Sequence, residues 1–368
     1  MINIKEKNIF SVGSSKLFFF HEAINAWQKK IPHPNIALEI QPSEICDHFC
    51  PNCQSKYSLS KKNLFDKKKY GQFIDISLLE KILDAPPSGI IISGHTGEPL
   101  LHPEIIKIFE FIKKTNIPTI LITNGSNINE ELAHLILRTC RGVRISLDAC
   151  NLQSYKETHG VSEKYWKRTL MNIRMLTSIK RSKKNSEQDC LIGIGYLTNK
   201  ISANGMKRAT ILAKQLGTDY IHFRPYHFDN YSIDKELKSC KVIENSGKFR
   251  VFSSSQKYEK IDCFVRNYNC CHGSAFFSVL DARGDVYICC HHVGNKDAKI
   301  GSLVNQSWND ILKSKTDFAR KNGFPNDQCI PHCRMHTHNI VLESAKEVFF
   351  CDSKENSFPE MISHAAFL

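Results

Sequence analysis

Three cysteines stand close together in the segment EICDHFCPNC, residues 44–53. Cys46, Cys50 and Cys53 have the spacing C-x3-C-x2-C. Thiolates bind zinc and iron–sulfur clusters, but a closed site of either kind takes four protein ligands. Three thiolates can hold a [4Fe–4S] cluster by three of its irons, which leaves the fourth iron open to a small molecule. The alternative is a zinc site with a fourth ligand such as His48.

Short apolar runs that alternate with stretches of helical periodicity must position these cysteines. The runs are IALEI (36–40), GIIISG (89–94), PTILIT (118–123), GVRISLD (142–148), LIGIGYL (191–197) and YIHFRP (220–225). In the stretch 102–115, Ile105, Ile108, Phe111 and Ile112 share one helical face. Because parallel strands need a crossover, this order predicts an α/β fold with a parallel sheet, either doubly wound or a partial barrel. Functional residues are then expected at the carboxyl ends of the strands, where the cysteines follow the first run.

The cysteine spacing and several later motifs together resemble the radical S-adenosylmethionine (SAM) enzymes. The later motifs are SGHTGEPLL (93–101), TNG (123–125), SLDA (146–149), IGIGY (192–196) and FRP (223–225). The resemblance covers residues 36–225 and implies a partial (βα)6 TIM-like barrel. In this family the open iron binds the amino and carboxylate groups of SAM. The reduced cluster cleaves SAM to methionine and a 5′-deoxyadenosyl radical, which abstracts a hydrogen atom from the substrate.

The resemblance also implies which residues bind the cofactor. Glu98 would accept a hydrogen bond from the SAM amino group, and Gly97 would let the backbone approach closely. Thr96 stands where many members have a first glycine, which is a departure from the pattern. The remaining expected SAM contacts are Thr123 and Asn124 at the third strand end, Ser146 and Asp148 near the ribose and carboxylate, Gly193 near the adenine, and Arg224 at the SAM carboxylate or a substrate anion.

A second group of cysteines lies in the C-terminal part of the chain. DARGDVYI (281–288) reads as a hairpin that would bring Cys271 and Cys289 together, and CIPHC supplies Cys329 and Cys333. The pattern resembles the SPASM and twitch extensions of radical SAM enzymes. Since only the C-x3-C part of the later SPASM motif is present, we expect the twitch type with one auxiliary [4Fe–4S] cluster. The alternatives left open are Cys270 for Cys271, Cys290 for Cys289, a second cluster using Cys263 and Cys351, and a structural zinc site.

Composition changes divide the chain into five parts. We expect a lead-in at 1–35, the radical SAM barrel at 36–230, a polar linker at 231–262, the auxiliary-cluster domain at 263–340 and a tail at 341–368. A lead-in of this length is too short for a leader-peptide-binding domain.

Composition and charge narrow the class of protein further. The chain has 368 residues, no run of 18 apolar residues and no secretory signal, so we expect a cytoplasmic protein without a membrane span. Fifteen cysteines, an odd number, argue against a disulfide framework. A formal charge of +13 favours an anionic partner.

The predicted function is oxidation or radical modification of a sugar-, cyclitol- or nucleotide-type small molecule. An external electron donor such as flavodoxin or ferredoxin would reduce the cluster. The runner-up is an enzyme that modifies a peptide or protein side chain. A distant alternative is a zinc-stabilised nucleic-acid-binding protein, although no nucleic-acid-binding motif is present.

Overall fold

The computed structural model describes most of the barrel and of the C-terminal domain. The described residues are 17, 19–53, 72–95, 97–182, 190–226, 229, 231–244, 249–258, 266–320, 324–325, 329–330 and 333–345. Thr96, Cys263 and Cys351, to which the sequence assigns possible roles, lie outside these ranges.

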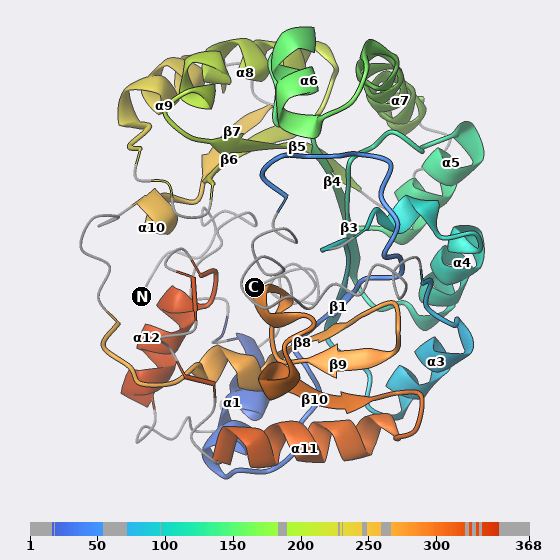
Figure 1. The fold of residues 1–368 in the computed structure, drawn as a ribbon, viewed down its shortest axis with the longest axis vertical. Helices are drawn as coiled ribbons and strands as arrows, with labels where there is room; N and C mark the ends of the chain where they lie inside the picture. Colours follow the sequence, from blue (N-terminus) through green and yellow to red (C-terminus); the bar gives the residue numbers. More distant parts are fainter. Residues whose placement is uncertain are drawn as a thin grey trace.

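One curved sheet of ten strands organises the described part of the chain (Figure 1). Its strand order is β10-β9-β8-β1-β2-β3-β4-β5-β6-β7. The six predicted strands are β1 (Ala37–Ile40), β2 (Gly89–Ile92), β3 (Thr119–Thr123), β4 (Gly142–Ser146), β5 (Leu191–Thr198) and β6 (Tyr220–Pro225). Each of them pairs in parallel with the next. The predicted α/β fold with a parallel sheet is therefore confirmed.

Helices surround the convex side of the sheet (Figure 1). The crossover helices are α3 (Ser77–Glu80), α4 (Ile105–Thr115), α5 (Glu130–Thr139), α6 (Leu152–His159), α7 (Glu163–Arg181) and α8 (Met206–Gln215). The helix α5 begins after Asn129, because the Asn129 side chain accepts a hydrogen bond from the Leu132 N–H at 2.8 Å and so caps the first turn. In α4 the fully buried aromatic residue is Phe109, whereas the predicted Phe111 is half-buried.

Successive side chains along each strand point alternately to the helices and to the concave side of the sheet. On β4 and β6, Val143, Ile145, Ile221 and Phe223 are fully buried in the main core with the helices. Their neighbours along each strand project to the other, concave side of the sheet. We call this concave side the lumen; its side chains from these strands are Arg144, Ser146, Tyr220, His222 and Arg224.

The stretch 231–262, for which the sequence predicts a linker, contains regular structure. It holds α9 (Asp234–Lys241), β7 (Arg250–Ser253) and α10 (Ser255–Tyr258). The strand β7 pairs in parallel with β6 and so extends the sheet by a seventh parallel strand. The polar composition concealed this strand because only Val251 of its four residues is fully buried.

The predicted C-terminal hairpin is present and is joined to the barrel sheet. Strands β8 (Phe277–Leu280) and β9 (Asp285–Tyr287) are antiparallel, with Gly284 at φ +80° in the turn. The next strand, β10 (Lys299–Ser302), pairs with β9. On its other side β8 pairs in parallel with β1, so the hairpin continues the barrel sheet.

Three further helices complete the described part: α1 (His21–Gln28), α11 (Trp308–Arg320) and α12 (His336–Ala345). They gather around the hairpin at the lower part of Figure 1. No helix among the described residues is long and apolar enough to span a membrane.

Candidate functional site

The three N-terminal cysteines follow β1 and lie within one loop. Burial raises the pKa of Cys46 and of Cys50 to about 12, and the nearby Cys53 adds to both of these shifts. Neighbouring thiols that resist ionisation are stabilised as thiolates by a bound cation, because metal binding displaces their protons. The donor set therefore fits an iron–sulfur cluster held by Cys46, Cys50 and Cys53.

Asp47, between two of these cysteines, fixes the loop to the segment after β3. Its carboxylate accepts hydrogen bonds from Asn124 Nδ2 at 2.8 Å, Ser126 Oγ at 2.7 Å and Asn127 Nδ2 at 2.9 Å. Burial alone would raise the pKa of Asp47, but the hydrogen bonds from Ser126, Asn124 and Asn127 and the charge of His48 together lower it. The charged carboxylate thus holds two strand-end loops together.

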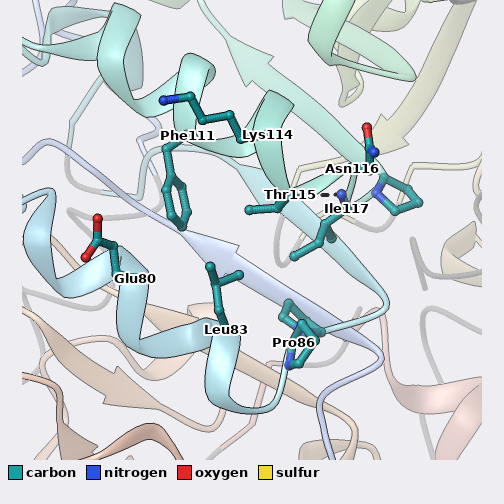
Figure 2. A pocket seen from close by; sticks show the side chains of 10 residues that line it. Glu80, Leu83, Pro86, Phe111, Lys114, Thr115, Asn116 and Ile117 are labelled. Atoms are coloured by element: carbon teal, nitrogen blue, oxygen red, sulfur yellow. Dashed lines mark hydrogen bonds between the residues drawn. The ribbon is translucent and has the colours of Figure 1, made fainter.

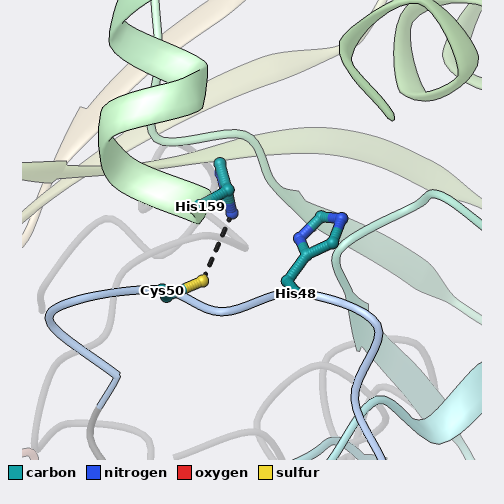
Figure 3. A group of neighbouring side chains, drawn as sticks. All are labelled: His48, Cys50 and His159. Atoms are coloured by element: carbon teal, nitrogen blue, oxygen red, sulfur yellow. Dashed lines mark hydrogen bonds between the residues drawn. The ribbon is translucent and has the colours of Figure 1, made fainter. Parts of the chain in front are cut away.

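His48 and His159 lie beside Cys50 (Figure 3). His159 Nε2 donates to the Leu147 carbonyl at 2.8 Å, which leaves Nδ1 facing Cys50 Sγ at 3.5 Å. The ring of His48 packs edge-on against Tyr155 and His159, and burial lowers the pKa of His48 to about 4. Ligand atoms of His48, Cys50 and His159 lie within 4.8 Å of one another, but Cys46 and Cys53 are not members of this group. The group therefore differs from the three-cysteine zinc site with His48 considered from the sequence.

Glu98 lies at the end of β2 with its carboxylate buried. It accepts hydrogen bonds from Thr123 Oγ1 at 2.5 Å, from the Asn124 N–H at 2.8 Å and from the Leu100 N–H at 3.2 Å. Burial raises the pKa of Glu98 to about 7 against these bonds. The structure thus brings together three of the expected cofactor residues, and their contact with SAM remains a prediction.

Gly97 allows this segment to pass close to the cysteine loop. A Cβ on Gly97 would lie 2.3 Å from the Ser43 carbonyl oxygen, closer than real Cβ atoms approach. The Glu98 N–H also donates to the Ile45 carbonyl at 2.7 Å. Only glycine leaves room for this backbone contact.

Asp148 follows β4 in a left-handed conformation, with φ of +44°. Its Oδ1 accepts from the Leu197 N–H at 2.6 Å, and burial raises its pKa while the nearby His159 opposes that change.

Ser146 is opposite Gly195 in the β4–β5 pairing. Tyr220 covers Gly193, since a Cβ there would lie 1.9 Å from Tyr220 Cζ. The expected adenine contact at Gly193 therefore stays a prediction, and the space beside it is filled by a ring.

The lumen carries a group of cationic side chains. Burial and then the charge of Arg224 lower the pKa of Arg144 to about 9, and burial lowers the pKa of Arg224. Burial, followed by the charge of Arg224, also lowers the pKa of Lys257 to about 8. No ion pair joins any of these three side chains to a carboxylate in the described ranges, whereas Arg334 pairs with Glu39 at 3.1 Å. The first three, which we call the lumen cations, are Arg144, Arg224 and Lys257.

The four C-terminal cysteines expected to bind an auxiliary cluster line one cavity. Cys271, Cys289, Cys329 and Cys333 surround it together with apolar side chains such as Phe324 and Met335. Cys270 lines a different cavity. Thiols gathered in an apolar enclosure fit a closed iron–sulfur site. This arrangement favours Cys271 and Cys289 from the two adjacent pairs, although the ligand assignment remains a prediction.

A cavity of about 720 Å³ lies elsewhere, between the segment after α3 and the end of α4 (Figure 2). Its lining includes Pro86, Pro87 and Pro118, which precede β2 and β3 at their amino ends. The cysteine loop follows the carboxyl end of β1, so this cavity lies at the other edge of the sheet. Size alone therefore does not identify the reactive site.

Two family models match the chain. Residues 40–186 match the radical SAM superfamily, and residues 270–336 match SPASM, an iron–sulfur cluster-binding domain. The chain therefore contains a radical SAM domain and, C-terminal to it, a SPASM iron–sulfur domain. It is accordingly an enzyme whose domains imply [4Fe–4S] clusters and SAM. These matches favour the radical SAM prediction over the zinc-stabilised nucleic-acid-binding alternative.

Curated relatives are distant and partial. The S-adenosyl-L-methionine-dependent tRNA 4-demethylwyosine synthase of Methanocaldococcus jannaschii is 24% identical over 168 residues, which are 44% of this chain and 51% of that protein. A protein named GTPase Obg from Brachyspira hyodysenteriae is 29% identical over 129 residues, 33% of this chain. The chain spans only 18% of the length of that GTPase.

Solved structures share the fold. SuiB of Streptococcus suis, bound to its precursor peptide SuiA, has a TM-score of 0.58 at 13% identity and covers 80% of this chain and 68% of SuiB. The enzyme anSMEcpe with bound AdoMet has a TM-score of 0.53 at 18% identity, covering 77% of this chain and 82% of anSMEcpe. Identities this low establish likeness of fold alone.

Sequence reasoning missed several residues of this region: Asp47, Arg144, His159 and Lys257. Arg144 carried a usable signal, because it interrupts an apolar strand whose neighbours Val143 and Ile145 are buried. The other three are recognised only through contacts between distant parts of the chain.

Proposed function

We propose that this enzyme uses SAM to start a radical modification or oxidation of a small molecule that carries an anionic group, of the sugar, cyclitol or nucleotide type. The observation that supports the proposal is that the lumen cations form no ion pair with a carboxylate within the described ranges. The cluster bound by the N-terminal cysteines would supply the electron that cleaves SAM. This chain's own residues would bind and orient the substrate.

Electrostatics favours an anionic substrate in the lumen. Charged side chains held away from water are costly unless a counter-charge accompanies them. Arg144 Nε and Arg224 Nε are buried and have no hydrogen-bond partner among the described residues. A phosphate or carboxylate accepts hydrogen bonds from guanidinium groups in a planar, paired geometry. Such a group would satisfy both arginines.

The auxiliary site supports an oxidative outcome. Lys257 lies close enough to both Arg224 and Cys333 for their charges to affect its pKa. The predicted auxiliary cluster would therefore lie next to the lumen cations. A cluster in that place can accept an electron from a substrate radical, so oxidation is the net reaction that we favour.

A peptide or protein side chain is the second candidate substrate. The fold resembles that of SuiB, which was solved with a precursor peptide. An aspartate, a glutamate or a C-terminal carboxylate of a peptide would meet the same lumen cations. The experiment must therefore separate the two substrate classes.

The test is isotope transfer from candidate substrates. The reconstituted protein is reduced with SAM and offered perdeuterated sugar phosphates, nucleotide sugars, neutral cyclitols or short acidic peptides, and 5′-deoxyadenosine is analysed for deuterium by mass spectrometry. We expect deuterium only from anionic small molecules. Deuterium from peptides alone, or equally from neutral cyclitols, would overturn the proposal.

A variant links that result to the lumen. Arg144→Met should raise KM for the anionic substrate about 100-fold, because a charge-assisted hydrogen bond contributes about 1.5–3 kcal/mol. Arg138→Met, in the last turn of α5, is the matched control and should leave KM unchanged. Equal KM values for both variants would contradict substrate binding by Arg144.

A further inference from the structure

A second cavity, of about 390 Å³, lies between α1 and α11 and apart from the lumen. Its lining comes from α1 and the segment that follows it, from the stretch between Cys270 and Ala275, and from α11. His33 precedes β1 and Ala275 precedes β8, so the cavity lies at the amino ends of these strands. The volume is within the usual range for small-molecule sites.

Lys315 gives this cavity its charge. The side chain is 2% exposed, and its Nζ contacts the Asn35 side-chain oxygen. No carboxylate forms an ion pair with Lys315 in the part of the chain that the structure describes. Burial lowers the pKa of Lys315 to about 7. A buried amine without a counter-charge is costly, and an anion in the adjoining cavity would relieve that cost.

The walls around Lys315 combine aromatic rings and methyl groups with polar side chains such as Gln28 and Thr316. The Trp27 ring meets His272 edge-on at 5.6 Å between centroids, and His33 stacks at a tilt on Phe276 at 5.2 Å. Ala275 and Ala319 contribute only methyl groups to the lining. Aromatic rings beside one buried cation match a ligand that has a flat body and one negative charge.

We propose that the cavity between α1 and α11 is a second ligand site, which takes a small aromatic carboxylate whose charge pairs with Lys315. The site is distinct from the lumen in its residues and in the edge of the sheet that it occupies. A single buried cation suits a monoanion better than a phosphate, which carries more charge and more acceptors. This proposal does not depend on the substrate proposed for the lumen.

The test uses benzoate and benzamide as probes on the reconstituted full-length protein. The two molecules have the same shape, and only benzoate is charged. Isothermal titration calorimetry should show saturable binding of benzoate and at least tenfold weaker binding of benzamide. Equal affinities for the two probes, or no binding of benzoate up to 50 mM, would overturn the proposal.

Variants of α11 locate the site. Lys315→Met removes the charge at similar volume and should weaken benzoate binding at least tenfold. Lys313→Met, an exposed position on the same helix, is the matched control and should bind benzoate as the wild type does. Ala319→Phe keeps Lys315 but fills the cavity, so it should also abolish binding and serves if Lys315→Met fails to fold. Wild-type affinity in Lys315→Met or in Ala319→Phe would refute the site.

Discussion

Asp47 should determine how firmly the cysteine loop is held, and Asp47→Ala tests this directly. The substitution removes three hydrogen bonds to a carboxylate, from Asn124, Ser126 and Asn127. Bonds to charged groups contribute about 1.5–3 kcal/mol each, and the partial exposure of Asp47 reduces that value. Taking about 1 kcal/mol for each bond gives a local loss of about 3 kcal/mol. This corresponds to an opening equilibrium about 150-fold more favourable.

Hydrogen exchange of backbone amides measures that opening. In the apo protein, amides of residues 44–53 and 124–127 should exchange about 150-fold faster in Asp47→Ala than in the wild type. Asp47→Asn keeps one carbonyl acceptor and should give an intermediate rate. Asp310→Ala is the control, because the Asp310 side chain contacts Ser307 and Lys313, both close to it in sequence near the start of α11.

Two outcomes of the exchange experiment would contradict this role of Asp47. Unchanged exchange in residues 44–53 would show that Asp47 does not anchor the cysteine loop. The same acceleration in Asp310→Ala would show that the effect is general destabilisation. In either case the predicted link between the two loops would be wrong.

Three further predictions concern the two expected cluster sites. Gly97→Ala places a Cβ 2.3 Å from the Ser43 carbonyl oxygen. Iron analysis should therefore find the N-terminal cluster lost, and calorimetry should find a destabilisation of about 1–3 kcal/mol. Full iron content in this variant would contradict the close approach of Gly97 to Ser43. Cys289→Ser should remove about four irons per chain and Cys290→Ser none, and the reverse result would exchange their roles. The raised pKa of Glu98 means that its ionisation lowers the free energy of unfolding of the apo protein as pH rises from 4.5 to about 7. In urea unfolding, Glu98→Gln should lose less stability over this pH range than the wild type. The same pH dependence in both proteins would exclude this role of Glu98.

The barrel was predictable because its strands carry their own signals. The runs that became β1 to β6 are apolar, and the motifs at their ends meet at one edge because parallel strands share a direction. The strand β7 lacked such a signal, since Arg250 is exposed and only Val251 is fully buried. Its pairing partner β6 defines it as a strand, and a partner is invisible in a local stretch of sequence.

Charged residues in the interior were harder to predict than apolar ones. Lys315 lies four residues after Ile311 and three after Leu312, both buried, so helical spacing alone assigns it to the buried face of α11. Lys257 and His159 gave no such indication, because their surroundings come from segments far away in the chain. The auxiliary cysteines were placed by the hairpin motif, but the choice between Cys289 and Cys290 depends on which side chain turns into the cavity.

The pairing of β1 with β8 has a consequence for biosynthesis. Residue 37 is aligned with residue 277, so one edge of β1 stays open while residues 41–276 are still being made. Contacts between such distant segments form slowly, and an open edge invites pairing with other chains. Expression of residues 1–262 alone would leave that edge permanently exposed. The sheet is therefore completed only when the C-terminal domain has been made. The chain of residues 1–262 should aggregate even though it retains all three N-terminal cysteines.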